Sequence, residues 1–401
     1  MTNTILYLSN LVSRMKKYPY IKFQRLWSIN AECYFELGQC NAIIQAISNA
    51  PLQPDYHEKL LNVSLVKGAQ ATTAIEGNTL TDKDIEKINM GDSLPPSKEY
   101  LETEVKNILN AFNRLLRDIT IDEKEEIVSP ELIKKLHKLV GQNLGKHFQA
   151  VPGQFRKNNV IVGSYKAPDY KDIPILIDNF CSWLQEEFHY KSGQSFIASV
   201  MQSIISHVYL EWIHPFSDGN GRTGRLLEFY LLIRAGNPDI ASHILSNYYN
   251  ETRTEYYRQL DLAYKKQDLT QFLHYAVKGF RDGLLETLKT IQKNLFEISW
   301  KKYIYDTFSE KKYTKKEVFK RKRDLILEIP MDHSLSLEEI SLINPRIAKI
   351  YATYTERTLR RDLEELIELK LVVKEKETYR ANNDILRTQL DVAVKKRSKI
   401  K

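Results

Sequence analysis

The sequence is poor in cysteine and has no long uninterrupted apolar run, and each absence excludes a class of protein. Its three cysteines, Cys33, Cys40 and Cys181, lack the paired spacings of a zinc site or a disulfide framework. No stretch of about 18 uninterrupted apolar residues is present to span a bilayer. The start lacks a signal peptide's order of basic segment, apolar core and small-residue cleavage site. We therefore expect reduced thiols, a cytoplasmic location and no membrane partner.

Alternating strand patterns are also scarce. Apolar residues recur at helical spacing through most of the chain, as in residues 131–144, 173–188 and 196–213. One exception is the segment 158–168, NNVIVGSYKAP, where a short β-branched run meets a Gly-Ser turn and a proline. This pattern predicts a small hairpin. We expect a mainly α-helical protein.

At 401 residues the chain is too long for one ordinary hydrophobic core. Segment 91–98, GDSLPPSK, is rich in proline and turn formers and predicts a loop between helices. A second segment, at about 308–324, is highly charged, and this composition favours a linker or an exposed helix. We therefore predict an N-terminal helical region at 1–95, a central domain at 96–300 and a C-terminal domain at 301–401.

The C-terminal domain holds all the net charge, with 25 Lys+Arg against 17 Asp+Glu in residues 301–401 and 34 against 34 before them. The pattern predicts a helix ended by Pro345, a second helix opening at Thr355 and a two-stranded wing at 372–382. This is the layout of a winged helix-turn-helix. Its second helix would offer Arg357, Arg360 and Arg361 to DNA. Protein docking, dimerisation or a merely soluble lysine-rich domain are the alternatives.

The chemistry concentrates in residues 214–225, HPFSDGNGRTGR, which lie between two apolar helical patterns. A helix, a glycine-rich loop and a second helix form a phosphate-binding arrangement, because Gly219 and Gly221 allow close approach and the first amides of the new helix are unpaired. Arg222 and Arg225 are three residues apart on one helix face, where two guanidinium groups can clamp two phosphates. The loop is therefore predicted to hold a nucleotide's phosphates.

Two further side chains of the loop complete a reactive set. A carboxylate that faces bound phosphates is repelled unless a cation lies between them, so Asp218 is the predicted Mg²⁺ ligand. His214 is the predicted general base, because a neutral imidazole can take the proton from a hydroxyl that attacks phosphorus. A turn histidine beside an ordinary loop is the alternative interpretation of each residue taken alone.

These twelve residues match HxFx(D/E)GNGRxxR, the core motif of the Fic family, at every specified position. The chain resembles that family firmly over residues 60–290. The resemblance implies a Fic-type helical core, ATP as substrate and attack on its α-phosphate by a hydroxyl of a target protein, with pyrophosphate leaving. It also implies Phe216 as a buried anchor for the loop, and a homodimer. The expected activity is that of a protein adenylyltransferase.

The resemblance extends to segments on either side of the motif. The hairpin with Val162, Gly163, Ser164 and Tyr165 lies where Fic proteins place a flap that clamps the target chain by strand addition. After the motif, Glu251, Tyr256 and Tyr257 are candidate adenine contacts, although an asparagine common in that segment is replaced by Thr252. A plain surface hairpin and core tyrosines are the alternatives.

Residues 72–78, TTAIEGN, resemble the inhibitory motif [ST]xxxE[GN] of many Fic proteins through Thr72, Glu76 and Gly77. The resemblance implies that Glu76 pairs with Arg225 and leaves ATP misplaced for attack. An exposed helical glutamate before a glycine cap is the alternative. The full set of expected nucleotide-binding residues is Glu76, Val162, Gly163, His214, Gly219, Asn220, Gly221, Arg222, Thr223, Gly224, Arg225, Glu251, Tyr256 and Tyr257.

Two rival functions remain open from the sequence. Fic relatives also transfer other nucleotides, phosphocholine or phosphate, although the intact GNGR and both arginines favour a nucleoside triphosphate. The chain can instead be a DNA-binding regulator whose central domain senses nucleotide, for which salt-dependent binding to duplex DNA is the discriminating observation. The acceptor residue is a Tyr, Thr or Ser, on another protein or on this chain itself.

Overall fold

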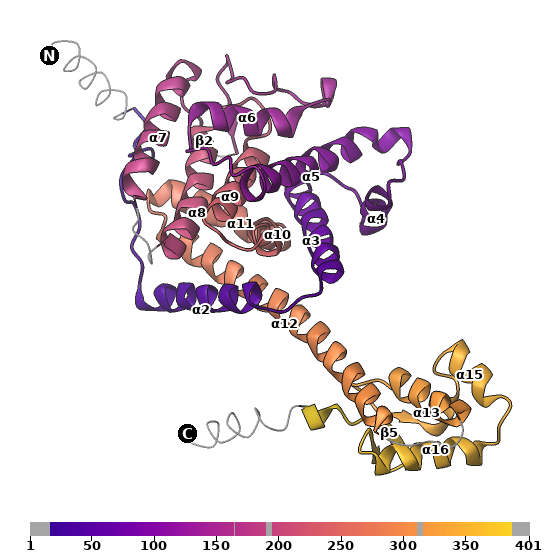
Figure 1. The fold of residues 1–401 in the computed structure, drawn as a ribbon. Coiled ribbons are helices and arrows are strands. Elements are labelled where there is room, and N and C mark those ends of the chain that lie inside the picture. Colours follow the sequence, from indigo (N-terminus) through magenta and orange to yellow (C-terminus); the bar gives the residue numbers. More distant parts are fainter. Residues whose placement is uncertain (1–16, 164, 190–194, 311–315, 387–401) are drawn as a thin grey trace. The chain divides into compact units, whose positions relative to one another are not determined.

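The computed structural model describes residues 17–163, 165–189, 195–310 and 316–386 (Figure 1). The chain divides into two compact units, Met1–Ile291 and Gln292–Lys401. The division falls inside one long helix, α12 (Thr270–Ser309), rather than at the predicted boundary of 300/301. The predicted N-terminal region does not stand apart either, because α3 (Pro54–Ile75) packs against α5, α9 and α10 of the first unit.

The first unit is an assembly of helices. Besides α3 and the beginning of α12, its helices are α2 (Ala31–Ser48), α4 (Asp82–Met90), α5 (Glu99–Thr120), α6 (Pro130–Gly141), α7 (Ile173–Glu187), α8 (Ser195–Ile213), α9 (Asn220–Arg234), α10 (Ile244–Glu251) and α11 (Arg253–Lys266). Short 3-10 turns occur at Pro96–Lys98, Gly145–His147, Tyr170–Asp172 and Asp239–Ala241. The mainly α-helical class expected from the sequence is confirmed.

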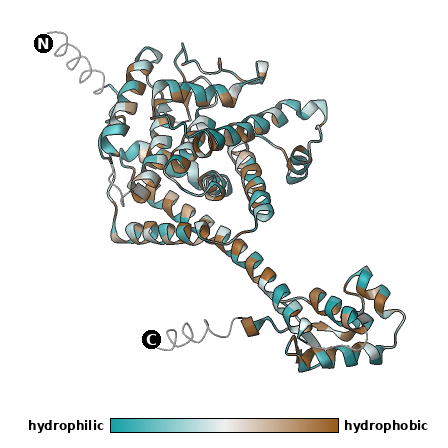
Figure 2. Cartoon of the chain, in the orientation of Figure 1, coloured by the Kyte–Doolittle hydropathy of each residue, from teal (hydrophilic) through white to brown (hydrophobic). Residues whose placement is uncertain are grey.

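Helices α8 and α9 form the centre of this unit and pack along each other. Every residue of α9 from Asn220 to Ile233 is buried, because this helix is covered on all sides by α3, α5, α6 and α8. Hydrophilic and hydrophobic residues alternate along α2, α3 and α5, which have only one side to bury (Figure 2). The stretch Phe196–Ile213 of α8 is long and apolar enough to cross a membrane, yet 78% of it is buried inside the protein, as in a core helix.

Two short segments predicted from the sequence are present in the first unit. Strands β1 (Ile161–Val162) and β2 (Tyr165–Lys166) pair antiparallel, which confirms the predicted hairpin, and Gly163 at its turn has a φ of 53°. The predicted loop after α4 begins at Gly91, which ends that helix in the left-handed conformation.

All three cysteines are free and buried, and burial raises the pKa of Cys33 to about 11 and that of Cys40 to about 12.

The second unit packs four helices and a small sheet around the end of α12. These are α13 (Lys316–Glu328), α14 (Leu337–Ser341), α15 (Pro345–Tyr351), α16 (Glu356–Glu368), and strands β3 (Leu335–Ser336), β4 (Val372–Glu375) and β5 (Thr378–Ala381), followed by a 3-10 turn at Asn383–Leu386. The sheet has the order β3-β5-β4 and is antiparallel throughout. The two-stranded element predicted at 372–382 is therefore present, while the name winged helix-turn-helix stays a prediction.

Two predictions for this unit were wrong in detail. Pro345 does not end a helix but begins α15, with Asn344 as its N-cap, because proline fits the first helical turn where no backbone donor is needed. The charged run at 308–324 is not simply exposed, because Arg321 and Lys322 of α13 are 6% and 4% exposed. Arg321 pairs with the fully buried Asp362 of α16, which offsets the cost of removing its charge from water.

Candidate active site

The motif residues lie between the end of α8 and the beginning of α9, and the loop between these helices is fixed by its own side chains. Asn220 donates from Nδ2 to the carbonyl of Phe216 (2.9 Å), and its Oδ1 accepts from the Phe216 amide (2.9 Å). The ring of Phe216 is fully buried and stacks on His137 with centroids 3.6 Å apart. Phe216 thus has the anchoring position expected of it, whereas the Asn220 side chain braces the loop.

His137 of α6 is a supporting residue that sequence reasoning missed. Its Nδ1 accepts from the Gly153 amide (2.9 Å), so the proton is on Nε2, which donates to the carbonyl of Asp218 (2.9 Å). Burial lowers the pKa of His137 to about 4 and keeps the ring neutral. The ring therefore connects α6 to the loop without adding charge.

His214 follows α8 directly and has a left-handed backbone, with a φ of 49°. Its side chain is 18% exposed, and its Nδ1 lies 3.3 Å from the carbonyl of Glu211, where an N–H can donate. Burial lowers the pKa of His214 to about 4, so the imidazole is neutral at pH 7. With Nδ1 donating to the backbone, Nε2 is left as a base, which is the state that proton abstraction requires.

Asp218 lies at the mouth of the loop, and its side chain is 26% exposed. Its Oδ1 accepts from Nη2 of Arg222 (2.8 Å), and its Oδ2 accepts from the amide of Gln149 (3.0 Å). No group of three or more metal-binding side chains occurs among the described residues. A single carboxylate fits Mg²⁺, since this ion is usually held by one or two carboxylates together with substrate phosphates.

The glycines of the loop allow close packing. A side chain at Gly219, whose φ is 79°, would lie 2.9 Å from the ring of Phe148, and one at Gly221 would collide with the carboxylate of Glu76. The Thr223 side chain is fully buried and donates back to the carbonyl of Gly219 (2.7 Å), while Gly224 packs against His207. Thr223 and Gly224 therefore face the protein interior rather than the mouth of the loop.

Arg225 and Glu76 form the ion pair expected from the sequence. Arg225 is 1% exposed and donates from Nη2 to Glu76 (2.6 Å) and to the carbonyl of Thr72 (3.0 Å), and from Nε to the hydroxyl of Thr72 (2.6 Å). Burial alone would raise the pKa of Glu76, but the charge and hydrogen bond of Arg225 lower it. Segment 72–78, which contains the last residues of α3, thus binds the guanidinium of Arg225, the more deeply buried of the two motif arginines.

Arg222 is also occupied by carboxylates. Its side chain is 5% exposed, lies over the ring of Phe148 and donates to Asp218 and, from Nη1, to Glu104 of α5. Glu104 was not predicted, because it lies 118 residues before Arg222 in the chain and matches no motif. Both arginines of the motif therefore have acidic partners in this structure.

The predicted adenine contacts lie in three different environments. Tyr256 is 1% exposed, and its hydroxyl lies 2.8 Å from Nε2 of His207 and accepts from Nη1 of Arg225 (3.5 Å). Tyr257 is 46% exposed and donates to the carbonyl of Ile75 (3.0 Å), whereas Glu251 is exposed at the end of α10. Tyr256 thus fits the alternative interpretation as a core tyrosine, and its hydroxyl accepts a hydrogen bond from Arg225.

The hairpin lies beside the loop through Tyr165, whose hydroxyl donates to the carbonyl of Glu211 (2.5 Å). Ile161 is 79% exposed, so the outer side of β1 is open, while Val162 is half-buried. Gly163 is at the turn, and Ser164 lies outside the described residues. The contact through Tyr165 places the hairpin next to the residues that precede His214.

Glu211 is a second residue that sequence reasoning missed. Its Oε2 lies 3.8 Å from Nδ1 of His214, and burial together with the nearby charge of Glu76 raises its pKa to about 8. Glu211 is therefore protonated at neutral pH. A signal existed in its position three residues before His214, in the last turn of the helix predicted to end at Ile213.

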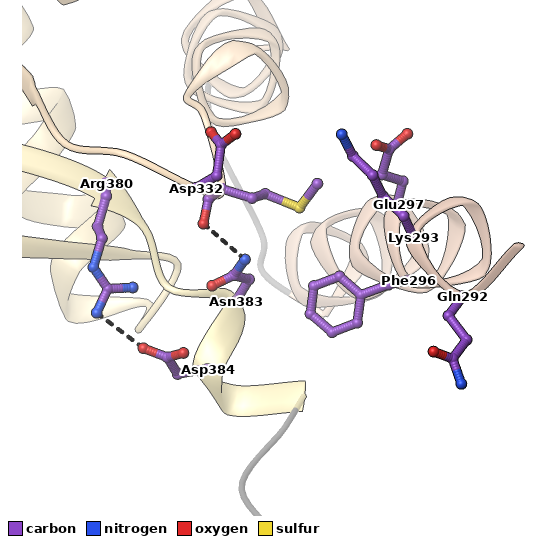
Figure 3. A pocket seen from close by; sticks show the side chains of 9 residues that line it. Gln292, Lys293, Phe296, Glu297, Asp332, Arg380, Asn383 and Asp384 are labelled. Atoms are coloured by element: carbon purple, nitrogen blue, oxygen red, sulfur yellow. Dashed lines mark hydrogen bonds and ion pairs between the residues drawn. The ribbon is translucent and has the colours of Figure 1, made fainter. Parts of the chain in front are cut away.

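A cavity of about 840 Å³ in the second unit contains none of the predicted site residues (Figure 3). Arg380 and Asp384 pair at its edge (2.9 Å), and Asn383 donates to the carbonyl of Met331 (3.0 Å). It is lined by Gln292, Lys293, Phe296, Glu297, Met331, Asp332, Arg380, Asn383 and Asp384. This cavity is therefore not the candidate active site, which lies at residues 214–225 in the first unit.

Comparison with known proteins agrees with this placement. Residues 127–232 match the family model described as the Fic/DOC family. Among related proteins, the protein adenylyltransferase Fic of Drosophila willistoni is 29% identical over 211 residues, covering 51% of this chain and 38% of that protein. The protein adenylyltransferase fic-1 of Caenorhabditis elegans is 30% identical over 227 residues, covering 56% of this chain and 42% of that protein. The chain thus spans about two fifths of the length of these relatives.

Solved structures share the fold. A Fic family protein from Desulfovibrio desulfuricans G20 superposes with a TM-score of 0.54 at 20% identity, covering 89% of this chain and 98% of that one. The Fic-1 fragment from C. elegans superposes with a TM-score of 0.54 at 24% identity, covering 66% and 74% of the two chains. The motif, the fold around it and the matched segment agree that residues 127–232 form a domain similar to those of the Fic/DOC family.

Proposed function

We propose that this protein is an adenylyltransferase that moves AMP from ATP onto a Tyr, Thr or Ser hydroxyl of a target protein. The observation that carries the proposal is the position of a neutral histidine, His214, on the same loop as two buried arginines that open the next helix. The related proteins of D. willistoni and C. elegans carry the name protein adenylyltransferase.

In the proposed reaction the acceptor hydroxyl attacks the α-phosphorus of ATP. His214 takes the hydroxyl proton on Nε2, the new oxygen–phosphorus bond forms, and the bond to the β-phosphate breaks to release pyrophosphate. Arg222 and Arg225 hold the departing phosphates and neutralise their charge. Asp218 would hold Mg²⁺, which supplies further neutralisation of the phosphate charge when bound.

We further propose that Glu76 inhibits the enzyme. Its 2.6 Å bond to Arg225 occupies the cation that must hold the phosphate farthest from the reacting centre. ATP bound beside this pair lacks one clamp and is misaligned for attack, and misalignment of the reacting atoms is costly in rate. Segment 72–78 lies at the end of α3, so a displacement of this helix end would release Arg225.

The test is transfer of label from α-labelled ATP to protein. Compared with the native chain, Glu76→Gly is expected to raise labelling on the order of tenfold or more, since a charge-assisted bond of about 1.5–3 kcal/mol no longer competes for Arg225. Adding His214→Ala is expected to lower labelling by about 10²–10⁴-fold. Glu58→Gly, an exposed position on the same helix, is the matched control.

Parallel reactions with γ-labelled ATP separate the rival chemistries. Label that arrives only from the γ-position would mean phosphate transfer. If neither label reaches protein in Glu76→Gly although ATP binds, the adenylyltransferase proposal is wrong, and a nucleotide sensor becomes the better description.

Homodimerisation and DNA binding are further proposals. Support for DNA binding comes from Arg357, Arg360 and Arg361, which are exposed on the first turns of α16, and from the wing-like hairpin beside that helix. Support for a dimer comes from the family resemblance alone. DNA binding requires that the protein binds more duplex than a basic control protein does. Dimerisation requires that sedimentation gives a mass of two chains.

A further inference from the structure

One carboxylate links the motif to two separate parts of the first unit. Glu104, on the side of α5 that packs against α3 and α9, has a side chain that is only 16% exposed. One of its oxygens accepts from Nη1 of Arg222, and the other accepts from Nδ2 of Asn78 (2.9 Å). Glu104 is therefore held from both sides and has little freedom to move.

Arg222 depends on this contact because it is itself almost fully buried. Its guanidinium lies 5.5 Å from the ring centroid of Phe148, and its Nε is buried without a hydrogen-bond partner among the described residues. Its outer nitrogens donate to Glu104 and to Asp218. A planar guanidinium fixed at one outer nitrogen presents its other donors in a defined direction.

The two carboxylate partners of Arg222 are not equivalent. Asp218 belongs to the loop itself and is 26% exposed, whereas Glu104 belongs to a neighbouring helix and is bonded to Asn78 as well. Asn78 is held in turn by the carbonyl of Leu101 on α5 (3.0 Å). A phosphate oxygen that enters from the open side can replace Asp218 at Nη2, while the bond from Nη1 to Glu104 remains.

We propose that Glu104 is a positioning residue that orients Arg222 toward the phosphates of the nucleotide. Glu104 does not touch the reacting atoms, and its effect passes through the arginine. The inference deepens the proposed function and rests on it, since it assumes that a nucleoside triphosphate binds at this loop. It assigns to α5 a part in substrate binding that the motif does not contain.

Glu104→Gln is a sharp substitution because it preserves shape and removes one acceptor. A glutamine side chain has a single acceptor oxygen, so it can satisfy Arg222 or Asn78 but not both. The variant is made in the Glu76→Gly background, in which Arg225 no longer pairs with a carboxylate of segment 72–78. Loss of a hydrogen bond to a charged group predicts that the Kd for ATP rises on the order of tenfold or more (about 1.4 kcal/mol).

Two ligands and one control variant separate positioning from general damage to the fold. Titration calorimetry with ATP and with adenosine, which has no phosphates, is compared for Glu76→Gly, Glu76→Gly/Glu104→Gln and Glu76→Gly/Glu102→Gln. Glu102 is a buried carboxylate of the same helix, bonded to Lys106 and to the Leu94 amide instead. We expect only Glu104→Gln to weaken ATP binding, with adenosine binding within twofold of the parent by any variant (about 0.4 kcal/mol).

The kinetic counterpart is a rise in the KM for ATP together with a fall in kcat, because Arg222 holds the departing phosphates, whose charge grows in the transition state. Equal loss of ATP and adenosine binding would reduce Glu104 to a structural residue. Unchanged ATP binding would remove the positioning role, and tighter ATP binding would show that Glu104 competes with phosphate. If the expected ATP and adenosine binding is found but no label from α-labelled ATP reaches protein, the transfer reaction is wrong. The role of Glu104 in binding the nucleotide is then unaffected.

Discussion

At the scale of single residues, burial moves the pKa values of His214 and Glu211 in opposite directions. The pKa of His214 falls to about 4 and that of Glu211 rises to about 8, because burial disfavours the charged form of each group. At neutral pH both are uncharged, with Glu211 in the last turn of α8 and His214 directly after the helix. The site therefore has a base that is deprotonated and a neighbouring carboxyl that is protonated, which suits proton transfer without strong repulsion of phosphates.

The low pKa of His214 predicts an unusual pH profile. Histidine is an active base only above its pKa, so an ordinary group with a pKa of about 6.5 would lose about 90% of its base form at pH 5.5. With a pKa of about 4, His214 retains that form, and Glu76→Gly removes a carboxylate whose charge raises this pKa. We expect labelling by Glu76→Gly to stay within about twofold between pH 7.5 and 5.5. A tenfold fall with unchanged near-ultraviolet circular dichroism would contradict this assignment.

Residues whose chemistry depends on local sequence were predictable, and those whose role depends on distant partners were not. His214, Asp218 and both arginines stand within one motif, so their placement on one loop and the start of the next helix followed from spacing. Tyr256 was predicted as a candidate adenine contact, yet it is buried beside Arg225 because α11 packs its inner side there. Glu104 carries no local signal at all, since only the packing of α5 on α9 brings it to Arg222.

At the scale of elements, α13 shows how a charged helix becomes part of a core. Arg321 donates from Nε and Nη2 to Asp362 (2.6 and 2.9 Å), and Tyr351 donates to the same carboxylate (2.8 Å). Asp362 has no exposed surface. Sequence reasoning placed this run in a linker or an exposed helix because charge usually indicates solvent. The sequence alone does not show that Asp362 of α16 lies buried beside Arg321 and supplies the counter-charge.

Removal of that counter-charge is expected to destabilise the second unit selectively. Asp362→Ala leaves Arg321 buried and unpaired, which costs about 3–5 kcal/mol. Hydrogen exchange of the α13 and α16 amides should accelerate accordingly, while exchange in α8 and α9 stays unchanged. The double variant Asp362→Leu/Arg321→Met should recover most of the loss, since apolar residues of similar volume replace a buried pair at little cost. Equal acceleration in α8 would contradict the selectivity.

At the scale of the whole molecule, two compact units share one continuous helix. The apolar periodicity of α12 runs from Thr270 to Ser309 without a break, so no proline, glycine cluster or change of period marks the division at Ile291. The charge pattern was more informative, because residues 1–300 are balanced and residues 301–401 carry the whole excess of 25 basic over 17 acidic groups. Composition therefore indicated a second unit, while its boundary required tertiary contacts.

The proposed DNA binding of the second unit predicts a measurable salt dependence. Each phosphate contact made by an arginine contributes about −0.9 to the slope of log K against log salt concentration. Arg357→Ala/Arg361→Ala in the full chain should weaken duplex binding and reduce the magnitude of that slope by about 1.8. The control is Arg25→Ala/Arg258→Ala, which removes two exposed arginines from the first unit. Equal slopes for both double variants would mean that α16 does not contact DNA and that the net charge alone attracts it.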